Sequence, residues 1–371
     1  MAASLYVGLM SGTSADGIDA CLAEFDGDRC REHGHVHCPF EPALRERVLA
    51  VARGASLDEA ATLDFLLAAA YADAVRQLLD ATGTAPDRIR AIGCHGQTVL
   101  HRPSGDAPTT VQLGDPHRLA ALCGIDVVAD FRRADMAAGG QGAPLAPAFH
   151  GPAFGAADED RCVLNLGGIG NLTVLPAGSD TPRLGFDTGP ANVLLDLWSA
   201  EHGHGEFDAG GAWAASGRVD AGLLERLRTD PWFRDPPPKS TGRELFEWAW
   251  LERQGGDDLR RLEPADVQAT LAELTATTIA DAVRVHAPAT ARLIVSGGGA
   301  RNADLLARLA RLLPGVAIDT TADHGIEPEH VEALAFAWLA RRRLHDLPGN
   351  CPAVTGARRE VPLGAVIRAP R

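Results

Sequence analysis

The chain has 371 residues, of which 46% are hydrophobic and 23% charged, and its formal net charge is −14. This length exceeds what one hydrophobic core usually holds and indicates two domains. The negative charge argues against nucleic acid and anionic membranes as partners, because both require a basic protein surface.

The seven cysteines are scattered without a CxxC pair, which argues against a disulfide framework or a zinc site and favours a reducing compartment. No apolar run is long enough to span a membrane, and the N-terminal residues lack the basic and apolar regions of a signal peptide. We therefore expect a cytoplasmic protein.

In the first half, residues 4–26 predict two strands that form a hairpin closed over a turn rich in glycine, serine and threonine. Leucines and alanines at helical spacing predict a helix over residues 60–81. The apolar runs 88–100 and 125–131 predict buried strands that end in polar residues. The glycine- and proline-rich residues 137–147 predict a hinge between domains.

The second half opens in the same way, because residues 162–176 again predict two strands around a glycine turn. A helix is expected around residues 267–282, and residues 292–302 predict a strand that runs into another glycine turn, followed by a helix. The last predicted helix, residues 330–347, carries arginines near its C-terminus, where the helix dipole favours cations, and Gly349 is its expected stop. The two similar halves predict a duplicated α/β fold with a cleft between the domains.

The turn GLMSGTSADGID, residues 8–19, has glycines that allow a close backbone approach to a ligand. Its backbone amides, with the hydroxyls of Ser11, Thr13 and Ser14, are suited to binding an anion such as phosphate. An ordinary tight hairpin uses the same residue types, so this turn alone leaves both interpretations open.

Two further glycine turns, NLGGIGNLT at 165–173 and SGGGARN at 296–302, follow apolar strands. The first does not fit the GxGxxG pattern of dinucleotide-binding folds, and the chain has no Walker motif, since Lys239 is its only lysine. Three such turns at strand ends are best explained by a site that holds a polyphosphate.

Asp187, in the string FDTGPAN, follows a predicted strand and precedes a predicted helix. It could cap that helix, which aspartate favours, or act as a general base in a cleft. The string DTG also occurs in aspartic proteases, but those enzymes need two aspartates and are mostly β, whereas this chain has one such string and many predicted helices.

Polar residues also end the two predicted strands of the first half, where α/β folds gather their binding groups. A tandem arginine pair is well suited to hold a carboxylate by a forked hydrogen bond. The residues concerned are His95, Gln97, Thr98, Arg132 and Arg133.

Taken in order, these motifs resemble those of the anhydro-N-acetylmuramic acid kinases over residues 5–365. The strings that carry the resemblance are GLMSGTSADGID, CHGQTVLHRP, DFRRADMAAGGQGAPLAP, NLGGIGNLT, FDTGPAN, PPPKSTGRE, SGGGARN and GIEPEHVEALAFAWLA. The resemblance implies the actin-like ATPase fold, a duplicated ribonuclease H-like α/β architecture in two domains with ATP in the cleft. We expect an N-terminal domain at residues 1–136, completed by the tail 355–371, and a C-terminal domain at 137–354.

The resemblance further implies that the three glycine turns bind ATP, two through its phosphates and the third on the adenosine side. The residues expected to bind ATP are Gly12, Thr13, Ser14, Asp16, Gly17, Asp19, Gly168, Gly170, Asn171, Gly297, Gly298, Gly299 and Asn302. The related sugar kinases carry an aspartate early in the first loop that is missing here, so the residue that orients Mg²⁺ is open. The candidates are Asp16, Asp19 and Asp187.

The implied reaction phosphorylates O6 of 1,6-anhydro-N-acetylmuramic acid while water opens the anhydro bridge at C1, and Asp187 would take the proton of that water. It yields N-acetylmuramate 6-phosphate and ADP and belongs to cell-wall recycling. The residues expected near the sugar are His95, Gln97, Thr98, Arg132, Arg133 and Glu332.

Three alternatives stay open from the sequence. A kinase for a neutral anhydrosugar such as levoglucosan would use the same fold, although the arginine pair favours a carboxylated substrate. A regulator that binds ATP or sugar without catalysis is disfavoured by Asp187 and three complete glycine turns. Lys239 could contact phosphate or stabilise its own loop, and the resemblance suggests a homodimer.

Overall fold

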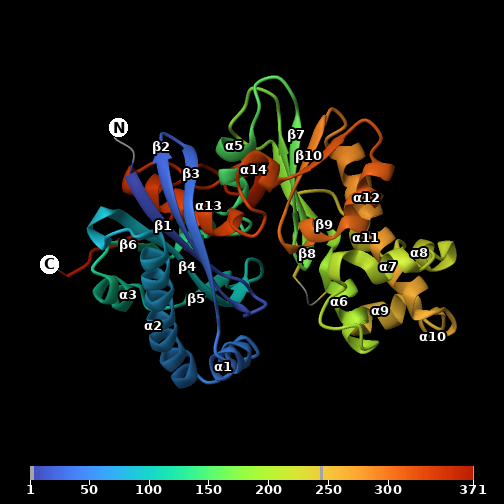
Figure 1. The fold of residues 1–371 in the computed structure, drawn as a ribbon, viewed down its shortest axis with the longest axis horizontal. Coiled ribbons are helices and arrows are strands. Elements are labelled where there is room, and N and C mark those ends of the chain that lie inside the picture. The colour runs from blue at the N-terminus through green and yellow to red at the C-terminus, as the bar shows by residue number, and fades with distance from the viewer. Residues whose placement is uncertain (1–3, 243–244, 371) are drawn as a thin grey trace. The chain divides into compact units, whose positions relative to one another are not determined.

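The computed structural model describes residues 4–242 and 245–370, and its contacts divide the chain into two compact units. Unit 1 comprises Met1–Ala153 and His330–Arg371, and unit 2 comprises Phe154–Glu329. Each unit contains one β-sheet with helices packed against it (Figure 1).

The sheet of unit 1 has the strand order β12-β6-β4-β1-β2-β3, and β5 pairs with β4. β1 is antiparallel to β2 and parallel to β4, which in turn is parallel to β6. The strands are β1 (Ser4–Ser11), β2 (Gly17–Asp26), β3 (Arg29–Pro39), β4 (Ile89–Arg102), β5 (Thr109–Leu113), β6 (Val127–Ala129) and β12 (Ala365–Ile367).

The sheet of unit 2 has the order β11-β10-β7-β8-β9. Its hairpin β7–β8 is antiparallel, β9 is antiparallel to β8, and β10 and β11 run parallel to β7. The strands are β7 (Arg161–Leu166), β8 (Ile169–Leu175), β9 (Leu184–Pro190), β10 (Arg292–Ser296) and β11 (Ala317–Thr320). This order and these directions match β6-β4-β1-β2-β3 of unit 1, so the predicted duplication and the fold class are confirmed.

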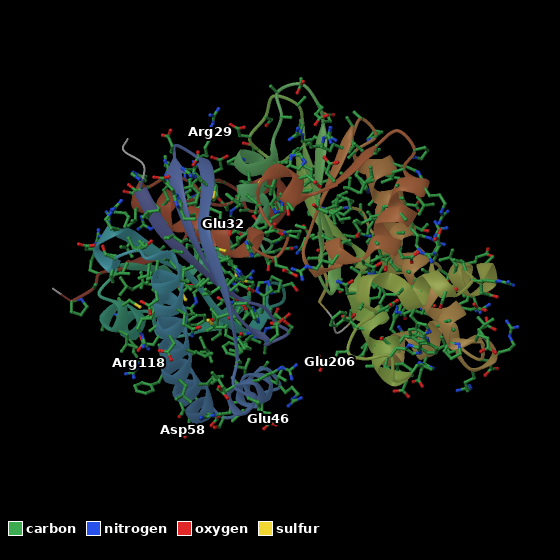
Figure 2. The ribbon with its side chains drawn as sticks, in the orientation of Figure 1. Arg29, Glu32, Glu46, Asp58, Arg118 and Glu206 are labelled. Carbon is green, nitrogen blue, oxygen red and sulfur yellow. The ribbon has the colours of Figure 1, made fainter. Side chains whose placement is uncertain are left out.

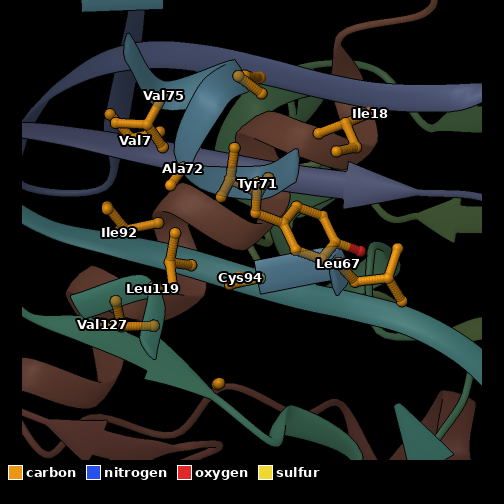
Figure 3. Close-up of a cluster of buried hydrophobic side chains, with 14 of the residues drawn as sticks. Val7, Ile18, Leu67, Tyr71, Ala72, Val75, Ile92, Cys94, Leu119 and Val127 are labelled. Carbon is orange, nitrogen blue, oxygen red and sulfur yellow. The ribbon is translucent and has the colours of Figure 1, made fainter. Parts of the chain in front are cut away.

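Two helices cover opposite faces of the sheet of unit 1, α2 (Leu57–Thr82) and α13 (Val331–Leu344). Because side chains alternate along a strand, Val7 and Ile92 point towards α2 and form a buried cluster with Tyr71 (Figure 3). On the other face, Gly8 and Gly93 lie against the backbone of α13.

The start and end of α2 follow from local residues. The Ser56 hydroxyl accepts a hydrogen bond from the Glu59 amide, and Asp58 (Figure 2) lies in the first turn, where the helix dipole favours acids. Gly83 ends the helix in the left-handed region at φ 62°. The predicted helix over 60–81 is therefore confirmed and is slightly longer.

In unit 1, shorter helices complete the connections: α1 (Pro42–Ala52), α3 (Pro116–Cys123), α4 (Phe131–Ala137), α5 (Pro147–Phe154, which crosses into unit 2) and α14 (Pro352–Thr355). In unit 2, most helices stand between β9 and β10: α6 (Asn192–Glu201), α7 (Ala212–Ser216), α8 (Ala221–Leu227), α9 (Trp248–Gly255), α10 (Asp258–Arg261) and α11 (Pro264–His286), with α12 (Ala303–Leu312) after β10. One-turn 3₁₀ helices lie at Pro86–Arg88, Ala209–Gly211, Pro231–Arg234, Gly298–Arg301 and Thr321–His324. No helix of the described ranges is long and apolar enough to cross a membrane.

The structure rules out one of the two interpretations of Asp187 and corrects the expected end of the last predicted helix. Asp187 does not cap a helix, because it lies inside β9, and the N-cap of α6 is Ala191. Gly349 is not the stop of α13, whose C-cap is His345. The expected packing of the tail on the first domain is confirmed, because β12 pairs with β6.

The compact units also differ in extent from the expected domains. Residues 137–153 belong with unit 1, and so do residues 330–354, which were expected in the second domain. The reason is α13, which packs across β1 and β4 and whose Trp338, Arg341 and Arg342 all donate hydrogen bonds to Asp28.

Candidate active site

The first glycine turn joins β1 and β2, and its backbone is fixed from inside unit 1. The Gly12 carbonyl accepts hydrogen bonds from the Ala15 amide at 3.2 Å and from the Gln97 side-chain amide at 3.0 Å. The Ser14 hydroxyl donates to Asp16 at 2.8 Å, whereas the Thr13 side chain is exposed. Gly17 is required sterically, since a Cβ there would lie 2.6 Å from the Cys38 carbonyl oxygen.

Ser11 does not belong to this turn's binding surface. Its hydroxyl lies 2.6 Å from that of Tyr71, in the buried interior of unit 1. The expected role of the Ser11 hydroxyl in an anion-binding turn is therefore wrong, while Thr13 and Ser14 stay candidates.

Asp19 is held by two histidines that the sequence analysis did not single out. His35 and His37, on one face of β3, lie 3.1 and 2.9 Å from its Oδ1. Burial raises the pKa of Asp19, but the hydrogen bonds and charges of the two histidines outweigh it and hold the pKa below its usual value. The sequence signal for this contact was the alternating histidines of HGHVH, residues 33–37, next to the strand that carries Asp19.

Arg132, on α4, is the centre of a cluster in unit 1. Its Nε donates to His95 Nε2 at 3.0 Å, and its Nη1 donates to the Gly142 carbonyl at 2.8 Å. Burial, reinforced by the charge of Arg132, lowers the pKa of His95 well below its usual value, so His95 is neutral and accepts with Nε2.

Glu332, in the first turn of α13, interacts electrostatically with Arg132. Desolvation raises the pKa of Glu332; Arg132 opposes this shift and Asp19 adds to it. Burial in turn lowers the pKa of Arg132 to about 10, against the opposing charge of Glu332. The structure thus places His95 in contact with Arg132, and it places Glu332 within electrostatic range of both Arg132 and Asp19.

The other predicted residues of unit 1 lie in different surroundings. Arg133 is exposed and pairs with Asp130 at 3.4 Å, so the tandem arginines do not form one fork. The Thr98 hydroxyl accepts from Gln112 at 3.2 Å. Gln97 is buried, and its Oε1 has no hydrogen-bond partner among the described residues.

In unit 2, Asp187 is nearly buried in β9 and its carboxylate is held on both oxygens. The Asn171 side-chain amide donates to Oδ1 and the Thr241 backbone amide donates to Oδ2, both at 2.8 Å. Burial raises the pKa of Asp187, although these two hydrogen bonds and the charge of Lys239 oppose the shift. Asn171 thus holds the carboxylate of Asp187, and its expected contact with phosphate stays a prediction.

The segment around Lys239 supports Asp187 from outside the sheet. The Lys239 carbonyl accepts the Asp187 amide at 3.0 Å, while its ammonium group donates to the carbonyls of Trp232 and Phe233 and lies 4.2 Å from the centre of the Trp232 ring. These contacts favour the structural role over a phosphate contact for this lysine. Thr241 was missed by the sequence analysis, and its place in the string PPPKSTGRE was the signal.

The second glycine turn connects the hairpin β7–β8 to the start of α6. The carbonyls of Gly167 and Gly168 accept the amides of residues 191–193 at 2.9–3.1 Å, which satisfies donors that a helix start leaves free. A Cβ on Gly170 would lie 2.7 Å from the Thr188 hydroxyl, so this position requires glycine.

The third glycine turn follows β10. Gly297 has φ 77°, and a Cβ there would lie 2.3 Å from Asn165 Oδ1, whereas Gly298 faces open space. The Asn302 side chain accepts from the Leu305 amide at 3.0 Å and therefore caps α12. Its expected contact with ATP stays a prediction, as do those of the turn glycines.

The side chains present could bind Mg²⁺ only together with phosphate oxygens and waters, not by themselves. In residues 4–242 and 245–370, no three His, Cys, Asp or Glu side chains converge in a way that could hold a metal. Mg²⁺ is commonly bound through one or two carboxylates together with phosphate oxygens and waters, and the Asp16 and Asp19 carboxylates beside the Gly12 turn fit that pattern. The unpartnered Gln97 Oε1 near the same turn is a further acceptor for a bound water.

Comparisons with known proteins identify the family of the chain. A family model described as anhydro-N-acetylmuramic acid kinase matches residues 4–369. A protein of that name from Xanthomonas campestris pv. campestris is 56% identical over 369 residues, covering 98% of this chain and 97% of the relative. Another from Saccharophagus degradans is 49% identical, with 99% of each chain covered.

A ROK family glucokinase from Streptomyces griseus, solved with glucose and AMPPNP, is structurally similar at 16% identity and a TM-score of 0.41, covering 91% of this chain and all of that one. The match along nearly the whole chain and the high identity to named relatives show that the protein belongs to the anhydro-N-acetylmuramic acid kinase family.

Proposed function

We propose that the chain is an ATP-dependent kinase that opens 1,6-anhydro-N-acetylmuramic acid with water and phosphorylates O6, giving N-acetylmuramate 6-phosphate and ADP. The observation that carries this proposal is the carboxylate of Asp187, fixed on both oxygens by Asn171 and Thr241. The family membership supports the substrate class.

Asp187 acts as the general base. A carboxylate has about four lone-pair directions, and two are taken by the two hydrogen bonds, so the others can accept a proton from water. Burial raises the pKa of Asp187 and so makes its carboxylate more basic than that of an exposed aspartate. General-base assistance of this kind contributes about 10²–10⁴ in rate.

The reaction balances around the anomeric carbon. The water oxygen bonds to C1 while its proton passes to Asp187, the C1–O6 bond breaks, and O6 takes the γ-phosphoryl group as ADP leaves. An acetal carbon tolerates the positive charge that builds up when this bond breaks. Phosphoryl transfer itself depends mostly on positioning and charge neutralisation.

The glycine turns of the two units are proposed to bind ATP through their backbone amides. Asp16 and Asp19 are the side chains of unit 1 that would hold Mg²⁺, which neutralises phosphate charge when it is bound.

Arg132 is proposed to bind the lactyl carboxylate of the substrate. Its Nε and Nη1 contact His95 and the Gly142 carbonyl, so its guanidinium is oriented before substrate binds and still carries further donors. This contact favours the carboxylated substrate over levoglucosan, which is the second candidate. The cytoplasmic location, the role in cell-wall recycling and the homodimer expected from the sequence stay predictions.

The test incubates the protein with Mg-ATP and each anhydrosugar in ¹⁸O-labelled water. We expect ADP to form with the muramic substrate and the label to appear at the C1 hydroxyl of the product. Label in released inorganic phosphate would instead show that water attacks phosphorus. That outcome, or the absence of turnover with every anhydrosugar, would overturn the proposal.

A further inference from the structure

Arg132 is oriented in part by the glycine-rich loop that follows its helix. Arg132 Nη1 donates to the carbonyl of Gly142, which lies in the glycine-rich loop after α4. Gly139 and Gly142 have φ of 91° and 70°, a region that glycine adopts without the steric cost that other residues meet. Whatever fixes the Gly142 carbonyl therefore also helps to fix the guanidinium of Arg132.

Asp135 anchors this loop. Its side chain is fully buried, and its Oδ2 accepts the Gly142 amide at 2.8 Å. Gly140 makes the close approach possible, since a Cβ there would lie 2.2 Å from the same oxygen. Only the Cα of Gly142 separates the anchored amide from the carbonyl that binds Arg132, because both groups belong to Gly142.

The other oxygen of Asp135 is held by the C-terminal tail. Its Oδ1 accepts the Asn350 side-chain amide and the Thr355 hydroxyl, both at 2.7 Å. The backbones join as well, because the Gln141 amide donates to the Thr355 carbonyl at 2.8 Å. The loop that orients Arg132 is thus fastened to residues more than two hundred positions away in the sequence.

The chemistry of this contact indicates a purpose beyond packing. A buried carboxylate is costly to desolvate, and all three donors to Asp135 are neutral groups. Apolar residues of similar size commonly give a buried site equal or greater stability. A charged anchor gives instead a defined geometry, because three donors must converge on two oxygens.

We propose that Asp135, with Thr355 and Asn350 of the tail, is a positioning device that fixes the Gly142 carbonyl and through it the guanidinium of Arg132. The inference rests on the proposed function, in which Arg132 binds the lactyl carboxylate. Asp135 does not touch the substrate and acts through the loop.

The first test compares Thr355→Val, which removes the hydroxyl at similar volume, with Thr355→Ser, which keeps it. Asp135→Asn is the stronger variant, and Asp346→Asn, an exposed aspartate in the same unit, is the matched control. Hydrogen exchange of residues 138–146 measures the loop directly in each protein without any substrate. We expect faster exchange of the Gly142 amide in Thr355→Val and Asp135→Asn, and wild-type exchange in Thr355→Ser and Asp346→Asn.

The second test is kinetic and uses two substrates that differ in the lactyl group, 1,6-anhydro-N-acetylmuramic acid and 1,6-anhydro-N-acetylglucosamine. Misplacing Arg132 is expected to raise KM for the first by about ten- to a hundredfold, with little change in kcat and little effect on the second. In an Arg132→Ala background, Thr355→Val is expected to add nothing further, because both changes act on one contact.

The outcomes separate this inference from the proposed function. Wild-type protein that turns over neither sugar would overturn the function, while the exchange measurement still tests the anchor. Unchanged exchange in both Thr355→Val and Asp135→Asn would overturn the inference. So would faster exchange with equal kinetic effects on both sugars, or additive effects in the Arg132→Ala background.

Discussion

At the scale of single residues, Asp187 shows how a strand can present the carboxylate proposed as the general base. Its backbone belongs to β9, so the position of its Cα is set by the sheet, and the Thr241 amide and Asn171 fix the carboxylate. An isolated aspartate in a loop would have neither constraint. The base and its supports thus come from three separate segments of unit 2.

Asp187→Asn is expected to lower kcat by at least about a hundredfold, because the amide keeps the shape but cannot take a proton. The KM for ATP should change little. Steady-state kinetics with the muramic substrate measures both, and circular dichroism checks that the variant is folded. Activity close to wild type would remove Asp187 from the mechanism.

The pH dependence follows from the same contacts. Asp187 must be ionised to act, so kcat/KM is expected to fall as the pH drops through its pKa, which burial places above the usual aspartate value. Asn171 donates to the ionised form and so lowers this pKa. In Asn171→Ala the acidic limb should therefore move to higher pH, and a limb that stays in place or moves to lower pH would contradict this assignment.

The neighbouring arginines are expected to differ sharply. Arg132→Ala should raise KM for the muramic substrate by about tenfold or more, the equivalent of losing a charge-assisted hydrogen bond. Arg133→Ala should stay within about twofold, because its exposed pair with Asp130 is of a kind that contributes little. Equal effects of the two substitutions on KM would show that the pair acts together as the sequence first indicated.

At the scale of elements, the contact of α13 with the sheet of unit 1 depends on two missing side chains. A Cβ on Gly8 would lie 1.8 Å from the Ala333 carbonyl oxygen, and one on Gly93 would lie 2.0 Å from that of Phe336. The helix can lie this close to β1 and β4 only because both strands carry glycine there. The same close packing places Glu332, at the start of α13, within electrostatic reach of Arg132.

Gly93→Ala is accordingly expected to cost about 3 kcal/mol of folding stability, since the added methyl meets backbone that cannot move aside cheaply. Gly222→Ala, on an exposed turn of α8, should stay within about 0.5 kcal/mol and serves as the control. Thermal unfolding followed by circular dichroism compares the two. Equal melting temperatures for wild type and Gly93→Ala would show that the helix is not held in this way.

The same elements show what the sequence could predict. The β1–β2 and β7–β8 hairpins, α2 and α12 were predictable because their apolar spacing and turn residues are local. The place of α13 was not, because it depends on Gly8 and Gly93, which are distant in sequence and look like ordinary strand glycines. In the site, the acids and glycine turns could be found as motifs, whereas the supports of Asp187 and Asp19 come from other segments whose proximity only the fold creates.

At the scale of the whole molecule, the two units share one pattern of strands, but unit 2 is formed by one continuous segment and unit 1 by two. Unit 2 is continuous, with a core formed within residues 154–329. Unit 1 needs two distant segments, because α13 covers one face of its sheet and β12 pairs with its β6 edge. The tail also holds Asp135, so the same residues complete the fold and the proposed anchor of Arg132.

This difference predicts how separated pieces behave. Residues 154–329 alone are expected to fold cooperatively, because both the sheet and the helices that cover it come from this segment. Residues 1–153 alone should not, because without α13 the sheet exposes the face around Gly8 and Gly93, and without β12 the edge of β6 is open. Coexpression with residues 330–371 is expected to restore a folded unit 1.

Thermal unfolding and amide spectra test these expectations on three preparations: residues 154–329, residues 1–153, and residues 1–153 coexpressed with residues 330–371. A sharp transition in residues 1–153 alone would show that α13 and β12 are accessory to unit 1. A broad, non-cooperative melt of residues 154–329 would show that the core of unit 2 does not suffice. Recovery of a cooperative transition only after residues 330–371 are supplied would place the stability of unit 1 in the contacts made by α13 and the tail.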